Sequence, residues 1–248
     1  MTEGRLLAIE TAGADVAVAI ADSSGVLAGA SCRTHRGHAE RLHLMVSSAL
    51  EMAGVTMDEI DCVAVDVGPG LFTGIRVGLS AAKGFGLGLG VGLVGLTSLE
   101  ILAEAASPGR DEAVALVDLR RGEIAWRLPP TGADGLAVVG HGTPGTLTGI
   151  LRERFGRGGV VVAGDGALRY AEAIAAGVPG VILASPALAS PPVASLAVRA
   201  VNEYSAGRAK SPVEVSPLYL READVRIGWT TRHDSPRHSG AAGDGDVN

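Results

Sequence analysis

The sequence predicts a two-lobed α/β protein in which one order of elements, β-β-β-α-β-α-β-α, occurs twice. In the first 108 residues, three strand-like segments with alternating apolar residues precede alternating helical and strand-like segments. The same order returns more faintly between residues 109 and 208. A chain of 248 residues with 47% hydrophobic content can also bury one large core or two small ones.

The first lobe begins with three predicted strands at 5–11, 15–21 and 26–32, the last two joined by a polar turn at 22–25. A helix is predicted at 38–53, because apolar residues recur there at helical spacing before a glycine that supplies the stop. The next predicted elements are a strand at 61–67, a helix from Phe72 or Thr73, a strand at 92–96 and a helix from Ser98.

The second lobe repeats this order. Its predicted elements are strands at 113–118, 123–128 and 136–139, a helix at 146–155, a strand at 160–163, a helix at 167–176, a strand at 181–184 and a helix at 193–205. Two facing lobes of this topology are typical of the actin-like, ribonuclease H-like (ASKHA) fold of actin, hexokinase and sugar kinases, in which nucleotide lies between the lobes.

This pattern divides the chain into four expected parts. We expect a first actin-like lobe at 1–108, a smaller second lobe at 109–208, and a segment at 209–229 that packs back on the core. The polar, glycine-rich end at 230–248 is expected to be a disordered tail.

Composition indicates a soluble, cytoplasmic protein. The longest apolar segment, 85–96, is too short for a membrane span and is interrupted by glycines, and the first residues lack a signal-peptide pattern. Cys32 and Cys62 fit a reduced interior better than a disulfide scaffold. A net charge of −6 argues against a surface built for nucleic acid, so we expect any tRNA contact to be local or made through a partner.

The most informative local feature is the break at Gly68-Pro69-Gly70, between the strand at 61–67 and the helix that follows. The two glycines permit a sharp turn, and the amide groups that open the helix point back into it. A helix start of this kind can hold an anion or another segment of backbone.

Nucleotide binding is a second possibility, since actin-like ATPases usually carry an acidic residue and a Gly-Thr turn in the first hairpin. Glu10 and Thr11 occupy that place here, and with Gly68 and Gly70 they are the candidate nucleotide contacts; the alternative is a plain strand end with a capped turn. The sequence contains no Gly-x-x-x-x-Gly-Lys-Ser/Thr motif, and the Gly-x-Gly-x-x-Gly match at 90–95 precedes a strand instead of following one.

Metal and nucleophile motifs are weak. His35, His38, Glu40 and His43 lie close together, but the two histidines of the predicted helix are five residues apart and point to different faces, which favours a solvated helix start. No serine lies in a Gly-x-Ser-x-Gly elbow, and both cysteines are in apolar strands, so we name no catalytic residue and no metal ligand.

A charged turn separates the first two predicted strands of the second lobe. It contains Asp118, Arg120, Arg121 and Glu123, and is either a solvated hairpin or a contact for a phosphate or an acidic partner.

The two long helices of the first lobe carry more apolar surface than one sheet can cover. The first has Leu44 and Met52 beyond its main apolar face, and the second presents Gly74, Gly78 and Ala82 at four-residue spacing, which lets another helix approach closely. Packing inside the lobe and a helix-to-helix interface between chains both explain this pattern.

Several segments form a recognisable set. In the first lobe they are Leu7-Ala8-Ile9-Glu10-Thr11, His38-Ala39-Glu40-Arg41-Leu42, Gly68-Pro69-Gly70-Leu71-Phe72-Thr73-Gly74-Ile75-Arg76-Val77-Gly78 and Ser80-Ala81-Ala82-Lys83-Gly84. Further along they are Asp118-Leu119-Arg120-Arg121-Gly122-Glu123, Gly164-Asp165-Gly166 and Pro217-Leu218-Tyr219-Leu220-Arg221. Together they resemble the bacterial TsaB (YeaZ-like) family, over about residues 6–221.

The resemblance implies a subunit of the tRNA threonylcarbamoyladenosine machinery, without its own metal site or cofactor, that binds and activates the paralogous transferase TsaD. TsaE is the ATPase of the set. TsaD-type enzymes carry metal-binding histidines where Ser98 and Leu102 stand here, so the chain resembles the non-catalytic partner. Pairing through the first-lobe helices implies an interface of His38, Arg41, Leu42, Leu44, Met45, Ser48, Met52, Thr73, Gly74, Arg76, Val77, Gly78, Ala81 and Ala82.

We also expect a homodimer when TsaD is absent. The alternative function is a small ATP- and magnesium-dependent transferase or kinase of the actin-like superfamily that uses Glu10 and Thr11. A peptidase-like activity ranks last, because no nucleophile or metal set supports it.

Overall fold

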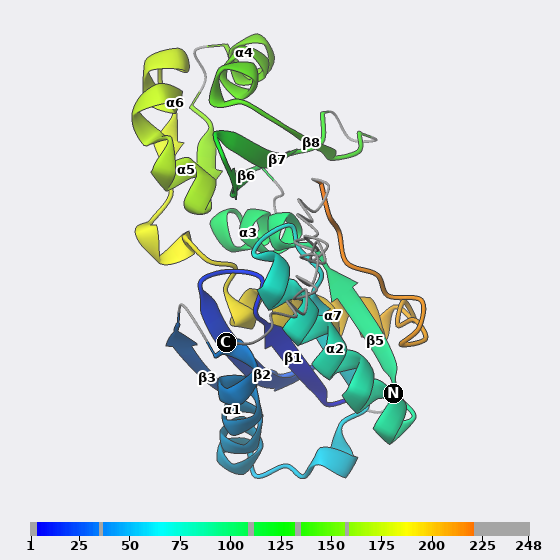
Figure 1. Ribbon diagram of the computed structural model, residues 1–248. Helices are drawn as coiled ribbons and strands as arrows, with labels where there is room; N and C mark the ends of the chain where they lie inside the picture. The colour runs from blue at the N-terminus through cyan, green and yellow to red at the C-terminus, as the bar shows by residue number, and fades with distance from the viewer. Residues whose placement is uncertain (1–3, 35–36, 109–111, 132–134, 157–158, 221–248) are drawn as a thin grey trace, which may run out of the picture.

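A computed structural model describes residues 4–34, 37–108, 112–131, 135–156 and 159–220, and within them it contains two five-stranded mixed sheets (Figure 1). The first sheet has the order β3-β2-β1-β4-β5. Its strands are β1 (Leu6–Glu10), β2 (Asp15–Asp22), β3 (Gly25–Arg33), β4 (Cys62–Asp66) and β5 (Gly92–Leu96). Strand β1 pairs antiparallel with β2 and parallel with β4, so the carboxyl ends of β1 and β4 meet at one edge of the sheet.

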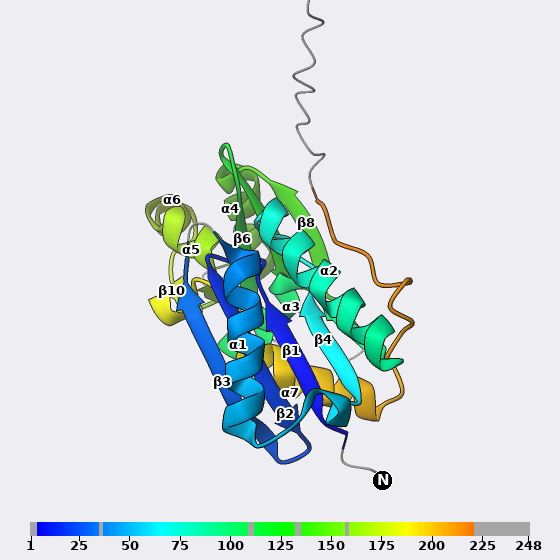
Figure 2. The ribbon, with the colours of Figure 1, turned by 60° about the horizontal axis from the view of Figure 1, so that its bottom comes forward.

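Helices cover both faces of the first sheet. Helices α1 (His38–Ala53) and α2 (Phe72–Leu89) lie side by side on one face (Figure 2), and α7 (Val193–Ser205) packs on the other. Successive side chains of a strand therefore point to opposite faces of the sheet. Leu7 and Ile9 of β1 belong to the core beneath α1 and α2, while Leu6 and Ala8 belong to the core beneath α7.

The second sheet has the order β10-β9-β6-β7-β8. Its strands are β6 (Val114–Arg120), β7 (Glu123–Leu128), β8 (Val138–Gly142), β9 (Val161–Ala163) and β10 (Ile182–Leu183). Helices α4 (Pro144–Phe155), α5 (Asp165–Arg169) and α6 (Ala171–Gly177) contribute to the core on one face, and α3 (Ser98–Ala106) covers the other. Two short 3-10 helices, η1 (Met57–Glu59) and η2 (Pro186–Leu188), lie in loops.

The last helix of each repeat packs on the sheet of the other repeat. Leu99 and Leu102 of α3 form a core with Val117 of the second sheet, and Leu196 and Ala200 of α7 belong to the core of the first sheet. In Figure 1, α3 accordingly lies between the two lobes. The expected boundary at 108/109 therefore separates the two repeats of the sequence. We propose it as a boundary between structural domains.

The segment after α7 runs along the first lobe. Leu93 and Lys210 exchange backbone hydrogen bonds of 2.8 Å each, Val215 enters the core beneath α1 and α2, and the Leu218 N–H donates to the Val67 carbonyl at 2.8 Å. Residues 221–229 of the expected C-terminal segment, and the expected tail at 230–248, lie outside the described residues.

The predicted α/β class, the repeated order and the actin-like architecture are confirmed. Two elements of the second lobe differ. The helix predicted at 167–176 is divided into α5 and α6, because Tyr170 between them leaves the helical region at φ −112 and ψ 23. The strand predicted at 136–139 lies instead at Val138–Gly142, where Gly140 pairs with Trp126.

The shift of this strand has a physical cause. The Trp126 ring lies against the backbone of Gly140, where an added Cβ would approach the indole nitrogen to 2.7 Å. Glycines usually weaken a strand, but here they admit the large ring of the neighbouring strand, and the pairing register follows. Within the described ranges, no helix combines the length and the apolar character that crossing a membrane requires.

Candidate functional site

The exposed face of α1 and α2 carries large apolar side chains. Leu44 and Met52 of α1 are 67% and 59% exposed. A groove of about 420 Å³ runs between the two helices, lined by Ala39, Leu42, His43, Arg76, Val77, Ser80, Ala81 and Phe85. A mainly apolar groove on a helical surface that also exposes leucine and methionine is typical of a surface that another protein covers.

The start of α2 is held by the C-terminal segment. Tyr219 packs on Phe72 with ring centroids 5.1 Å apart, and the Arg76 guanidinium lies 3.8 Å from the centre of the Phe72 ring. The Arg76 Nε also donates a hydrogen bond of 3.2 Å to the Tyr219 hydroxyl. These contacts fix the Arg76 side chain at one end of the groove.

The structure divides the expected interface residues into three groups. The exposed ones are Arg41, Leu44, Ser48, Met52, Thr73 and Arg76; the half-buried ones are His38, Met45, Val77 and Ala81; the buried ones are Leu42, Gly74, Gly78 and Ala82. The first two groups can contact a partner directly, and Leu42 can be contacted through the groove that it lines, whereas Gly74, Gly78 and Ala82 are enclosed within the lobe.

The buried glycines of α2 face the chain's own first strand. A Cβ at Gly74 would lie 2.0 Å from the Thr11 carbonyl oxygen, and one at Gly78 would lie 2.2 Å from Thr11 Oγ1. The glycines therefore let α2 lie directly on the end of β1. Of the two explanations for the small-residue pattern, the structure supports packing inside the lobe for Gly74 and Gly78.

The candidate nucleotide contacts are mostly directed inward. Thr11 Oγ1 donates a hydrogen bond of 2.8 Å to the Gly74 carbonyl, and Glu10 Oε1 accepts hydrogen bonds from the amides of Ala12 and Gly13 at 2.8 and 3.1 Å. Both side chains are buried. Gly68 adopts a positive φ of 95 in the turn before α2.

Gly70 is the one member of this set that lines the cavity between the lobes. This interlobe cavity has a volume of about 200 Å³ and is bounded by the loops at 12–14, 69–71 and 189–191 together with Asp118 and Asp165. Pockets that hold drug-sized ligands usually measure about 300–1,000 Å³. The interlobe cavity of this structure is smaller than that range.

Beside this cavity, two carboxyl groups meet at the carboxyl edge of the first sheet. Glu10 ends β1 and Asp66 ends β4, and both are fully buried. Burial raises the pKa of Glu10 well above its ordinary value, with the charge of Asp66 as a further cause, and burial also raises the pKa of Asp66. Sequence reasoning named Glu10 but missed Asp66, whose only signal was a polar residue at the end of an apolar strand.

Asp118 is the centre of the charged turn in the second lobe. Its buried carboxylate accepts hydrogen bonds from the Arg120 amide and from Arg120 Nη1, both at 2.9 Å, and lies 3.4 Å from Arg169 Nε. The amide of Asp118 itself donates to Asp165 Oδ1 at 2.8 Å. Arg120 and Arg121 both adopt positive φ, 67 and 53, so the turn is built around Asp118 despite a conformation that non-glycine residues disfavour.

Helix α3 supplies the positions expected to distinguish this chain from TsaD. Ser98 is buried and its hydroxyl donates to both oxygens of Asp66, at 2.8 and 2.7 Å, while Leu102 lies in the core between α3 and the second sheet. Neither side chain offers a metal a nitrogen ligand. In the part of the chain that the structure describes, no group of three or more histidine, cysteine, aspartate or glutamate side chains is placed to hold a metal ion; His35 lies outside that part.

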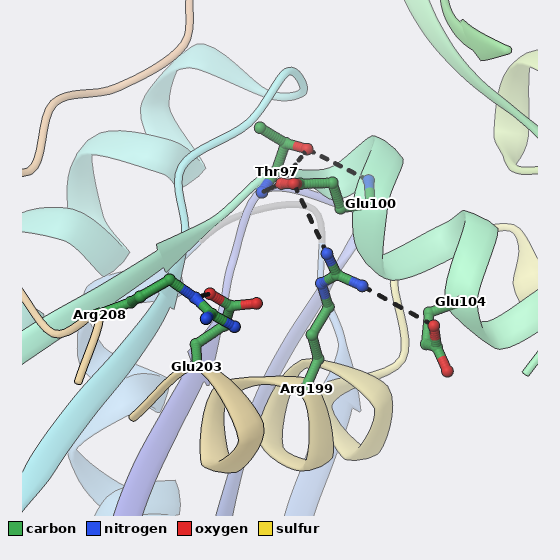
Figure 3. A network of polar contacts seen from close by, with 6 residues as sticks. All are labelled: Thr97, Glu100, Glu104, Arg199, Glu203 and Arg208. Atoms are coloured by element: carbon green, nitrogen blue, oxygen red, sulfur yellow. Dashed lines mark hydrogen bonds and ion pairs between the residues drawn. The ribbon is translucent and has the colours of Figure 1, made fainter. Parts of the chain in front are cut away.

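A polar network joins α3 to α7 (Figure 3). Thr97 and Glu100 cap the start of α3 reciprocally, and Arg199 of α7 reaches both Glu100 and Glu104, with N···O distances of 3.9 and 3.8 Å. Glu203 pairs with Arg208 beyond the end of α7. The network connects α3 and α7, each of which packs on the sheet of the other repeat.

Comparison with known proteins agrees with these features. The family model described as "TsaD: tRNA N6-adenosine threonylcarbamoyltransferase" matches residues 32–128. The tRNA threonylcarbamoyladenosine biosynthesis protein TsaB of Escherichia coli is 34% identical over 124 residues, which cover 49% of this chain and 53% of that protein. An uncharacterised protein of Mycobacterium leprae is 31% identical over 225 residues, covering 89% of this chain and 56% of that one.

Among solved structures, a Pseudomonas aeruginosa protein described as similar to the peptidase YEAZ superposes with a TM-score of 0.73 at 25% identity, covering 88% of this chain and all of that one. The fold and the α1/α2 surface thus define a two-lobed, actin-like α/β protein with an exposed helical face. Within that class, the chain is similar to proteins of the TsaB (YeaZ) family, and these matches support an assignment to it. The matches span about half the length of these two curated relatives.

Proposed function

We propose that this chain is a non-catalytic scaffold subunit of the tRNA threonylcarbamoyladenosine modification complex, and that it binds and activates the TsaD transferase through α1 and α2. The observation that carries the proposal is the exposed apolar surface of these helices, which combines the exposed Leu44 and Met52 of α1 with the mainly apolar groove between α1 and α2. The similarity to E. coli TsaB, whose name places it in this biosynthesis, supports the same assignment.

Activation would follow from binding energy alone. If TsaD in its productive arrangement fits the α1/α2 face better than TsaD in other arrangements, association shifts its population toward the productive state. This role requires no chemical group in the present chain. TsaE, the ATPase of the set, would join the assembled complex, and any tRNA contact would be made through that complex in the cytoplasm.

The inward direction of Glu10 and Thr11 supports this role over the alternative of an ATP- and magnesium-dependent transferase or kinase. Both side chains form hydrogen bonds within the lobe, so neither is presented to the interlobe cavity. A homodimer through the same face, when TsaD is absent, is part of the proposal because exposed apolar side chains favour self-association.

The decisive experiment is a titration of TsaD with the full chain, read as complex mass and as threonylcarbamoyladenosine formed on tRNA in the presence of TsaE. We expect Leu44→Asp to abolish the complex and the stimulation, while Leu136→Asp, the same change at an 86% exposed leucine of the second lobe, leaves both unchanged. Unaltered binding by Leu44→Asp would remove this face from the proposal. Modification of tRNA by this chain alone would refute its non-catalytic role.

A further inference from the structure

The carboxyl edge of the first sheet brings together two acidic side chains that are 56 positions apart in the sequence. Strands β1 and β4 are parallel neighbours with Ile9 opposite Val65, so Glu10 and Asp66, the next residue of each strand, end side by side. Both are completely buried. Two ionised carboxylates in such a position would repel each other and forgo hydration at the same time.

The hydrogen bonds of the two groups are unequal. Asp66 is fully engaged, because its oxygens accept from the Gly68 amide at 2.7 Å and from the Ser98 hydroxyl at 2.8 and 2.7 Å. Glu10 Oε1 accepts from two backbone amides. Glu10 Oε2 is covered and accepts a hydrogen bond from no donor of the described residues.

We propose that Glu10 and Asp66 form a proton-binding site, in which one proton resides on Glu10 Oε2 and is shared with the Asp66 carboxylate. A proton there turns the unpartnered oxygen into a donor and removes the repulsion between the two groups. Asp66 remains the charged acceptor, because its carboxylate accepts hydrogen bonds from the Gly68 amide and the Ser98 hydroxyl.

Electrostatic surroundings favour the same assignment. Burial raises the pKa of Glu10 well above 4.5, the charge of Asp66 raises it further, and the amides of Gly13 and Ala12 oppose this only in part. Burial is also the largest cause that raises the pKa of Asp66, and the charge of Glu100 on α3 adds to it. Arg199 of α7 faces Glu100 across 3.9 Å.

The site joins three segments of the fold. Glu10 holds the turn after β1, Asp66 holds the 68–70 loop before α2, and Ser98 begins α3, the helix that packs on the second sheet. A shared proton therefore stabilises the junction at which the first lobe meets the helix of the second. Loss of the proton would weaken this junction. The proton-binding site is independent of whether the chain binds a partner.

The sign of the pH dependence follows from linkage. The folded pKa of Glu10 is raised above its unfolded value, so the native state binds the proton more tightly. The stabilisation is fully present below the unfolded pKa and is lost as pH rises toward the folded one. One proton bound only by the native state changes the unfolding equilibrium constant by about tenfold per pH unit.

The test compares denaturant unfolding of the full chain with that of Glu10→Gln between pH 5 and 9. Glutamine keeps Oε1 as an acceptor and presents an N–H toward Asp66, so it mimics the protonated acid. We expect the wild-type unfolding constant to rise with pH by up to about tenfold per unit more than that of Glu10→Gln. Glu51→Gln, the same change at an exposed position of α1, should retain the wild-type slope.

Two further measurements identify the proton and its place. Infrared spectroscopy of the wild type at pH 7 should show a protonated-carboxyl band that Glu10→Gln removes. Asp66→Asn should destabilise the fold at every pH, because its amide cannot accept all the hydrogen bonds of the carboxylate. Equal slopes for wild type and Glu10→Gln, or no such band, would overturn the proposal. Stabilisation of the wild type but not of Glu10→Gln by magnesium chloride at pH 8 would also overturn it, in favour of a cation site.

Discussion

Gly78 of α2 lies directly against the Thr11 side chain at the end of β1, so closely that a Cβ at position 78 would stand 2.2 Å from Thr11 Oγ1. The same hydroxyl donates to the Gly74 carbonyl one turn earlier. Helix α2 carries half of the proposed partner face. The contact of its buried side with Thr11, through Gly74 and Gly78, therefore positions that face.

Gly78→Ala should destabilise the protein by about 1–3 kcal/mol, the usual cost of forcing a methyl group into a packed site. Thr11 cannot rotate away without breaking its buried hydrogen bond to Gly74. Gly84→Ala, on the same helix but with open space around the added Cβ, should instead stabilise by about 0.4–1 kcal/mol. Denaturant unfolding measures both. Equal effects of the two substitutions would show that the contact with Thr11 does not position α2.

Local patterns in the sequence were sufficient to predict most elements of the fold. The predicted bounds of α1 and of β5, β7 and α7 coincide with the structure, because apolar periodicity and flanking breakers such as Gly54 act within a few residues. The same periodicity identifies an apolar helix face without specifying what covers it. The repeat in the sequence therefore places α7 in the second lobe, although the helix packs on the first sheet.

The contacts of the candidate site join residues that are far apart in the sequence, and local periodicity does not predict such contacts. Glu10 and Asp66 meet only because β1 and β4 are parallel neighbours in a particular register. Likewise, the four-residue spacing of Gly74 and Gly78 indicated a close approach, but only the placement of α2 on β1 shows that the approach is internal. The exposed Leu44 and Met52 were predicted more directly, since they lie outside the apolar face of their own helix.

Asp118→Asn should cost about 1–3 kcal/mol of stability, because the Asp118 carboxylate is 1% exposed and removal of its charge leaves Arg120 and Arg169 without their shared acceptor. The Arg120 amide, in a turn of positive φ, also loses a charged acceptor. Arg169→Ala should cost less, since its guanidinium is more than half exposed and lies farther from Asp118. Thermal unfolding ranks the two variants, and a larger loss from Arg169→Ala would contradict the central role assigned to Asp118.

The two cysteines should differ sharply in reactivity. Burial in β4 raises the pKa of Cys62 to about 12, so its thiol is almost entirely protonated at pH 8, whereas Cys32 of β3 is half-buried and reachable from solvent. Because thiolate is the reacting form, we expect a disulfide reagent at pH 8 to modify one thiol per native chain and two after unfolding. Mass spectrometry should place the native adduct on Cys32, and Cys32→Ser should remove it. Modification of Cys62 at a comparable rate in the folded protein would mean that β4 opens to solvent, which its central place between β1 and β5 argues against.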